Sequence, residues 1–561
     1  MRYLIRVALA LALLFWAMSL HAQPPAAPMP APAGGALTLD AVVDRITKGE
    51  SALTARLRAY HPIAEVYIQT LAPDPKLGTV PTRDDYFLGQ FDGKDGPNLM
   101  PLSPREGSFS KGGLWTRPAV QFLPSGFAAT TVPDWRGLDP QRYEYEFVRR
   151  EFVGEARTLV FDVRPRGDSA DGFTGRLWVE DRDFNVVRFN GISRNVDHNL
   201  TGFFRKKISF HVDSWRVNVR PGLWLPAYVY CEETDLSDKP GFPRMPRIKA
   251  QVRLWGYQIK GSSSQSEFST IVIDAPNVQD NAEQAKQLSP VQSQRRWEAQ
   301  AEENVVDRLT RAGLLAPRGH VDDILETVIN NLAVTNNLTL EVPVRARVLL
   351  TQPLESFTVG HTIVISRGLI DVLPDEASLA MVLGHELSHV ILGHQLIDTK
   401  FAFADRLMVQ DGDLLKTLRF RHPQAEESAA DAKVLELLNK SPYKDKLSEA
   451  GLFLRAVSAN AKALTNLIQP HMGDFIVEGG QPLAPIIDKA PQLVPERLDQ
   501  IAALPLGARL VVDPWSDTVD LLRTTTVPLA SAREKVPLAI TPLMPYIRYA
   551  EASAQTAQPP R

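Results

Sequence analysis

Residues 379–394 read LAMVLGHELSHVILGH, an apolar stretch with His385, Glu386 and His389 near its middle. Such a stretch belongs in a protein core, where a polar side chain costs free energy unless a partner satisfies it. The stretch therefore raises a chemical question, which is what satisfies these three side chains.

The residues before this stretch predict that it is a helix. Pro374 suits the first turn of a helix, and Asp375 and Glu376 favour its positive end. Within a helix, His385 and His389 lie four positions apart, about 40° around the axis, so both imidazoles project from one face.

This spacing, His-Glu-x-x-His, is typical of zinc sites. Two neutral imidazoles one turn apart can both reach a tetrahedral ion at about 2.0–2.1 Å. Glu386 is about 60° from His389, too far round to be a ligand, but it can act as general base toward a water molecule. We expect one Zn2+ per chain, held by His385 and His389, with Glu386 catalytic. The alternative is a pair of core histidines satisfied by hydrogen bonds.

The next histidine is not expected to complete the site. On a continued helix His394 lies about 140° from His389 and points elsewhere, so we expect it either to support the site from outside the ligand set or to be exposed. Gln395 stands where metzincins have their third histidine, so that pattern is also missing.

A better third ligand lies in residues 422–438, HPQAEESAADAKVLELL. Pro423 opens a predicted helix, and Glu427 and Asp431 lie four apart on one face of it. We expect Glu427 to ligate zinc and Asp431 to hydrogen-bond a ligand histidine. Glu426 is the competing ligand, although its i+4 partner is an alanine. The alternative is an ordinary solvated acidic turn.

The pair of motifs, HELSH followed by a helix bearing ESAAD, resembles the zinc metallopeptidase family of the CAAX prenyl endopeptidases and the heat-shock protease HtpX. The resemblance covers roughly residues 321–431 and weakens toward residue 504. It implies a mainly helical, zincin-type metallopeptidase domain that acts on a polypeptide substrate.

The resemblance also implies a strand that binds substrate. In the family an edge strand precedes the active helix and pairs with the substrate as an added strand. Residues 354–373, LESFTVGHTIVISRGLIDVL, occupy that place, with Ser356, Phe357 and Thr358 at the matching positions.

The group that would stabilise the transition state is less clear. The family often has a histidine near the oxyanion, a few residues before an arginine. Here Arg497 is present, but Ala490 stands where that histidine would be. His471 and Tyr443 are the candidates that remain.

The N-terminus predicts export. Residues 1–22 combine a basic start, an apolar run and a small-residue cleavage point after Ala22, as secretory signal peptides do. The alternative is an uncleaved anchor, but crossing a bilayer needs roughly 20 apolar residues and the run from Val7 to Leu20 is shorter. Residues 23–36 are rich in proline and alanine and predict a disordered tether.

Cys231 is the only cysteine, which excludes intrachain disulfides. We expect a soluble periplasmic protein without a transmembrane segment after signal removal.

The chain of 561 residues predicts more than one domain, and its fold class is α+β. Alternating segments such as YEYEFVRREF (143–152) and ISFHVDSWRVNV (208–219), separated by turns such as DRDFN (181–185), predict an antiparallel β-rich, half-barrel-like N-terminal domain. The expected division is a signal peptide at 1–22, a tether at 23–36, the β-rich domain at 37–273, a linker at 274–293, the metallopeptidase domain at 294–515 and an extension at 516–561.

Charge excludes some partners. The net charge of −3 gives no reason to expect nucleic acid or an anionic membrane surface as a partner. We expect a zinc endopeptidase of the bacterial cell envelope that acts in protein quality control, with envelope proteins as candidate partners. The alternative is a chaperone-like, client-binding protein with a structural or latent zinc site. Glu386 favours the enzyme, because a closed structural site has no need of a carboxylate beside the metal.

Overall fold

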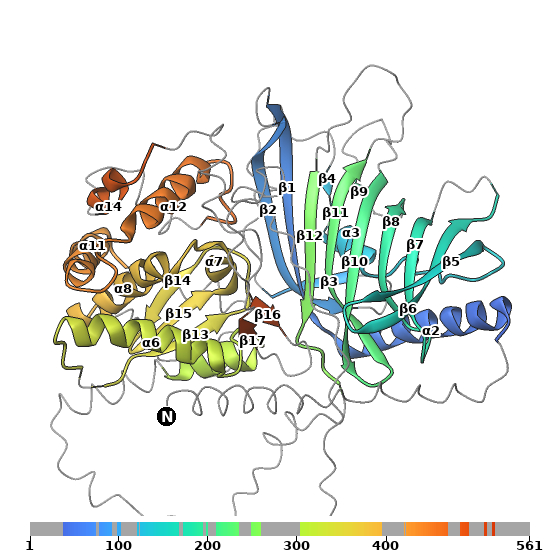
Figure 1. The fold of residues 1–561 in the computed structure, drawn as a ribbon, viewed down its shortest axis with the longest axis horizontal. Helices are drawn as coiled ribbons and strands as arrows, with labels where there is room; N and C mark the ends of the chain where they lie inside the picture. The colour runs from blue at the N-terminus through green and yellow to red at the C-terminus, as the bar shows by residue number, and fades with distance from the viewer. Residues whose placement is uncertain are drawn as a thin grey trace, which may run out of the picture. The chain divides into compact units, whose positions relative to one another are not determined.

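The fold is described from a computed structural model (Figure 1). It describes residues 37–74, 78–92, 98–102, 121–122, 124–167, 172–194, 198–199, 209–234, 248–259, 303–340, 342–394, 420, 422–468, 483–492, 510–512 and 519–521. The predicted signal peptide, tether and linker, and residues 522–561, lie outside the described residues. Among the described helices, none combines the length and apolarity needed to cross a membrane.

The N-terminal half is built on an antiparallel sheet of ten strands among the described residues. Helix α2 (Leu39–Tyr60) precedes it, and short elements α3 (Pro124–Ala128), η1 (Ala129–Thr131), β4 (Gln121–Phe122) and β9 (His198–Asn199) accompany it. The ten strands are β1 (Ile63–Asp74), β2 (Gly78–Asp92), β3 (Asn98–Pro101), β5 (Tyr143–Val153), β6 (Ala156–Pro165), β7 (Phe173–Glu180), β8 (Val186–Ser193), β10 (Ser209–Arg220), β11 (Leu223–Thr234) and β12 (Ile248–Trp255).

The order of the strands makes this sheet open. Strands β5, β6, β7, β8, β10, β11 and β12 follow one another as a meander, and β12 then pairs with β1, with Val66 opposite Val252. Strands β2 and β3 extend the sheet beyond β1, so β3 and β5 are its two edges. The predicted antiparallel β-rich region is thus confirmed as a sheet that does not close on itself.

Two buried charges tie the helix to the sheet. The guanidinium of Arg216 on β10 donates two hydrogen bonds, of 2.6 and 2.7 Å, to the carboxylate of Glu50 on α2. Both side chains are almost completely buried. A buried charge is tolerated when a partner of opposite sign meets it with good geometry, as this two-pronged contact does.

The C-terminal half gathers its helices around a small sheet. Three strands have the order β13-β15-β14, with β13 parallel to β15 and β14 antiparallel to it, so β14 is an edge strand. Helix α8 contacts β14, β15 and the helices α6, α11 and α12. The elements are α6 (His320–Thr335), β13 (Arg345–Leu349), β14 (Ser356–Val359), β15 (Thr362–Ser366), α7 (Arg367–Val372), α8 (Glu376–Leu392), α11 (Gln424–Asn439), α12 (Leu447–Asn460), α14 (Ala484–Lys489), β16 (Leu510–Val512) and β17 (Val519–Leu521).

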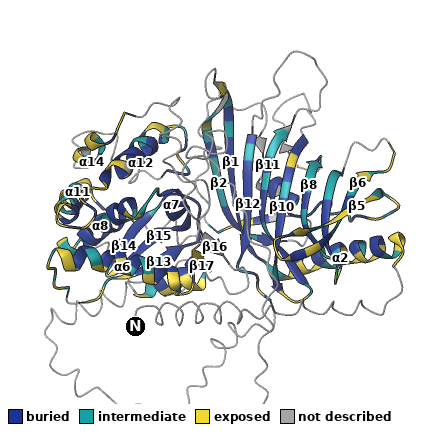
Figure 2. Cartoon of the chain, in the orientation of Figure 1, coloured by how far each residue is buried: buried dark blue, intermediate teal, exposed yellow. Residues whose placement is uncertain are grey.

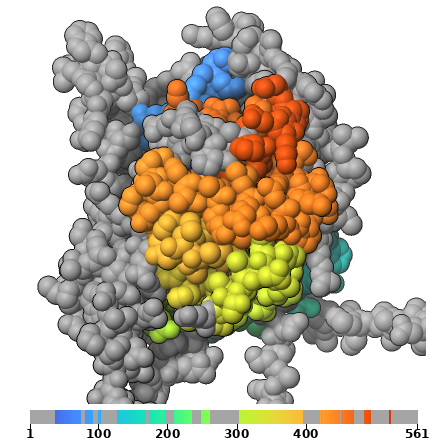
Figure 3. Space-filling model, turned by 90° about the vertical axis from the view of Figure 1, so that its left-hand side faces the viewer, coloured from blue at the N-terminus to red at the C-terminus, as the bar shows by residue number. Residues whose placement is uncertain are grey.

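Burial is concentrated around α8. Figure 2 shows β14, β15 and most of α8 as buried, and Figure 3 shows orange α11 and α12 as a band next to yellow-green α6. The apolar core of this half includes Leu332 from α6, Leu383 from α8 and Val434 from α11. The central helix is therefore held on several sides, which fixes the direction of the side chains it carries.

The ends of α8 follow the sequence signals. The carboxylate of Asp375 accepts a hydrogen bond of 2.8 Å from the backbone N–H of Ser378, as a helix N-cap does. At the other end Gly393 adopts a left-handed conformation with φ of 70°, which ends the helix after Leu392. The helix predicted from about residue 375 is confirmed.

One glycine sets how closely the helices approach. A Cβ atom at Gly384 would lie 2.9 Å from Cγ2 of Val434 on α11 and 3.2 Å from Cδ1 of Leu332 on α6. A side chain there would need its neighbours to move. Gly384 therefore lets α8 and α11 come together immediately beside His385.

Candidate active site

Three predicted ligand residues meet between two helices. His385 and His389 project from α8, and Glu427 projects from α11. The two Nε2 atoms are 3.2 Å apart, and Oε2 of Glu427 is 3.2 Å from Nε2 of His385 and 3.6 Å from Nε2 of His389. Ligands bound to zinc at about 2.0–2.1 Å in a tetrahedron are about 3.3–3.4 Å apart. The three donor atoms thus have the spacing that a tetrahedral zinc ion requires.

The neighbouring carboxylate orients one of the ligands. Nδ1 of His385 is 2.9 Å from Oδ1 of Asp431, one turn beyond Glu427 on α11. Because Asp431 engages Nδ1, the Nε2 atom of His385 is left to face His389 and Glu427. A carboxylate behind a ligand imidazole is the usual support of a zinc-binding histidine.

The electrostatics of the group favour a positive charge at its centre. Burial alone would lower the pKa of His385, but its contacts with Asp431 and Glu427 raise that pKa well above its usual value. Burial would raise the pKa of Glu427, but the hydrogen bonds and charges of His385 and His389 hold it well below its usual range. Both shifts have one cause, which is the attraction between the imidazoles and the carboxylates of this group.

His394 lies beside the ligand group. Its Nδ1 atom is 3.0 Å from Nδ1 of His389. The expected direction of His394 is wrong, because it assumed a continued helix, whereas the chain turns at Gly393. The expectation that His394 could support the site from outside the ligand set is confirmed. The contact is on the side of His389 away from Nε2, so His394 supports that ring without joining the ligands.

His422, which pairs with Glu426, makes a second contact with His389. The ring of His422 stacks on that of His389, with centroids 4.0 Å apart and planes inclined by 19°. Nδ1 of His422 is 2.8 Å from Oε2 of Glu426. Glu426, the competing ligand, is therefore engaged by His422, while Glu427 meets the two histidines of α8.

The carboxylate of Glu386 points to the small sheet. Oγ of Ser356 donates a hydrogen bond of 2.7 Å to Oε1 of Glu386, and Oγ1 of Thr358 donates one of 2.7 Å to Oε2. Both hydroxyls belong to β14, the strand that was expected to bind substrate. Phe357, the residue between them in the chain, stacks its ring on that of Phe420, with the ring centroids 4.0 Å apart. The sequence motifs alone gave no indication that Glu386 and this strand would touch.

Tyr443, one of the two candidates for transition-state stabilisation, lies away from this group of residues. The hydroxyl of Tyr443 donates a hydrogen bond of 2.8 Å to Oε1 of Glu376. Glu376 is nine positions before His385, about 13 Å along the helix. His471 and Arg497 lie outside the described residues.

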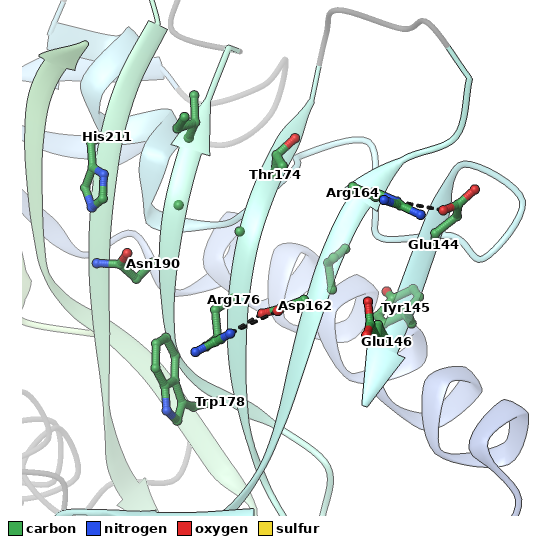
Figure 4. A pocket seen from close by; sticks show the side chains of 14 residues that line it. Glu144, Tyr145, Glu146, Asp162, Arg164, Thr174, Arg176, Trp178, Asn190 and His211 are labelled. Carbon is green, nitrogen blue, oxygen red and sulfur yellow. Dashed lines mark hydrogen bonds and ion pairs between the residues drawn. The ribbon is translucent and has the colours of Figure 1, made fainter. Parts of the chain in front are cut away.

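A polar hollow also lies on one face of the N-terminal sheet, over β5, β6, β7, β8 and β10 (Figure 4). Its charged side chains largely pair with one another. Arg176 makes two hydrogen bonds to Asp162, of 2.7 and 2.9 Å, and Arg164 makes one of 2.7 Å to Glu144. These pairs satisfy the two arginines without a ligand.

The part of the chain that carries this group of residues matches a known protein family. Residues 320–446 match the model of peptidase family M48. The matched span contains His385, Glu386, His389 and Glu427. This match supports a metallopeptidase and, with it, a polypeptide substrate.

Solved structures resemble part of the chain only distantly. A LolA superfamily protein from Nitrosomonas europaea is 14% identical over 41% of this chain and 97% of its own, with a TM-score of 0.23. A DUF1329 family protein from Desulfovibrio piger is 12% identical over 40% and 97%, with a TM-score of 0.19. The MucA/MucB complex of Pseudomonas aeruginosa is 10% identical over 38% and 93%, with a TM-score of 0.12. A search of the curated proteins finds no match.

Proposed function

We propose that the chain is a zinc-dependent endopeptidase, an exported relative of the CAAX prenyl endopeptidases and HtpX. The observation that carries the proposal is the tetrahedral spacing of the donor atoms of His385, His389 and Glu427, with Glu386 beside them on α8. When bound, Zn2+ supplies a Lewis acid that polarises the scissile carbonyl and makes water more acidic.

Glu386, Asp431 and strand β14 would each have a separate role in the reaction. Glu386 takes a proton from the attacking water and passes it to the leaving amine. Asp431 keeps the imidazole of His385 turned toward the metal. Strand β14, the edge strand of its three-stranded sheet, would pair with the substrate backbone as an added strand.

Cleavage of an unfolded protein tests this proposal. We expect purified protein loaded with one equivalent of zinc to cleave casein, because an unfolded chain can lie along a strand edge. A zinc chelator should stop cleavage, and added Zn2+ should restore it. The measurement is the appearance of casein fragments over time. Protein that holds zinc and prevents client aggregation, but never cleaves casein, would favour the chaperone-like alternative.

We propose that the enzyme acts in the periplasm, on misfolded or envelope proteins. The support is the basic and apolar pattern of residues 1–22. The mature protein is expected to begin near Gln23 and to appear in the soluble periplasmic fraction. N-terminal sequencing of the fractionated protein checks this, and a chain that begins at Met1 in the membrane pellet would contradict it.

A further inference from the structure

We infer that the hydroxyls of Ser356 and Thr358 hold the carboxylate of Glu386 in its working orientation, so that β14 positions the general base as well as the substrate. The inference rests on the proposed peptidase function. It assigns to these two side chains a role different from substrate binding.

Each carboxylate oxygen of Glu386 accepts one hydrogen bond from β14. An ionised carboxylate only accepts hydrogen bonds, so Ser356 donates to Oε1 and Thr358 donates to Oε2, each at 2.7 Å. Each oxygen keeps a further lone pair, with which the carboxylate can accept a proton from water. Hydrogen bonds to a charged acceptor are stronger than those between neutral groups.

Burial makes these two contacts decisive. The exposed fractions of Ser356, Thr358 and Glu386 are 4%, 3% and 4%. Bulk water therefore does not compete for the carboxylate, and the two hydroxyls determine its rotation. The Thr358 hydroxyl also lies 3.2 Å from the backbone oxygen of Glu386, but its single proton is directed to the nearer carboxylate oxygen.

The strand places both hydroxyls on the correct side. Successive side chains of a strand alternate between its faces, so residues 356 and 358 share a face and Phe357 lies on the other. Pairing with β15, where Ser356 lies opposite Ile365 and Thr358 opposite Ile363, holds the strand in register. The base is thus anchored at one end by α8 and at the other by the sheet.

This arrangement links substrate alignment to the base. A peptide that adds a strand to β14 would pair with the backbone of the strand whose Ser356 and Thr358 hydroxyls hold Glu386. A displacement of about 1 Å in a catalytic group can cost about 10²-fold in rate. Correct pairing of the substrate along β14 therefore also keeps Glu386 at the distance that proton transfer requires.

Three variants and a control test the inference by kinetics. Thr358→Val removes the hydroxyl at nearly constant shape, and Ser356→Ala removes the other. Each should lower kcat by about 10-fold to 100-fold, while KM changes less than about twofold and zinc content stays at one per chain. Thr358→Ser should recover most of the lost kcat. Ser388→Ala, which removes a buried hydroxyl of α8 bonded only to the backbone oxygen of Gly384, should leave kcat unchanged.

A thermodynamic cycle on the zinc-free protein tests the contact without activity. Thr358→Val should lower Tm in the presence of Glu386 and have a much smaller effect in the Glu386→Ala background, because the partner is then absent. Equal Tm losses in both backgrounds would overturn the inference, and so would a rise in KM at constant kcat. If the wild type cleaves nothing, the proposed function fails, while the cycle still decides whether the hydroxyls hold the carboxylate.

Discussion

Glu386→Gln is expected to lower kcat by about 10²–10⁴ while the protein keeps its full zinc content. Glutamine has the size of glutamate, but its amide cannot take a proton from water. Its carbonyl oxygen still accepts a hydrogen bond from one of the β14 hydroxyls, so the fold should persist. The measurements are peptide cleavage and zinc stoichiometry on the same preparations.

Glu376→Gln is the matched control for this variant. It makes the same chemical change on the same helix, at a carboxylate that accepts a hydrogen bond from Tyr443. A glutamine oxygen can accept that bond too, and the site lies about 13 Å away. Equal cleavage by wild type and Glu386→Gln would remove Glu386 from the mechanism.

Glu427→Ala is expected to remove most of the bound zinc, because a site with three protein ligands has no spare donor. Asp431→Asn should keep the three ligands but weaken zinc affinity by about 10-fold to 100-fold, since the support of His385 is altered. Elemental analysis after dialysis, and competition with a chelator of known affinity, measure both effects.

Glu426→Ala serves as the control, because the Glu426 carboxylate is engaged by His422 and does not face the two ligand imidazoles. This variant should retain zinc at one per chain. Loss of zinc in Glu426→Ala with retention in Glu427→Ala would reverse the assignment of the third ligand.

The sequence was most informative where short-range geometry governs the structure. The beginning of α8 was predicted from Asp375 and its neighbours, whereas the turn at Gly393 that ends the helix was not, so the direction of His394 was wrong. Glu427 was preferred to Glu426 because Asp431 lies one turn further along the helix from it. The structure brings the carboxylates of Glu427 and Asp431 to His385. Strands with clear alternation, such as β5 and β10, were likewise found from their pattern.

Contacts between distant residues were not accessible in this way. Strand β2 was not found, because Gly78, Pro81 and two aspartates interrupt its alternation, and its pairing with β1 overrides the weak local preference. The bonds from Ser356 and Thr358 to Glu386 depend on how β14 packs against α8, about 30 positions away. No periodicity within either segment reports such packing.

The close approach of the helices at Gly384 would give a bound zinc ion a structural role as well. Because the ligands come from both α8 and α11, a bound ion joins two segments that are well separated in the chain. A ligand that binds only the folded protein stabilises it by about 2.7 kcal/mol when its free concentration is 100 times Kd. Zinc supply would therefore govern how long the protein survives in the cell, and a zinc-starved copy would be more easily degraded by other proteases.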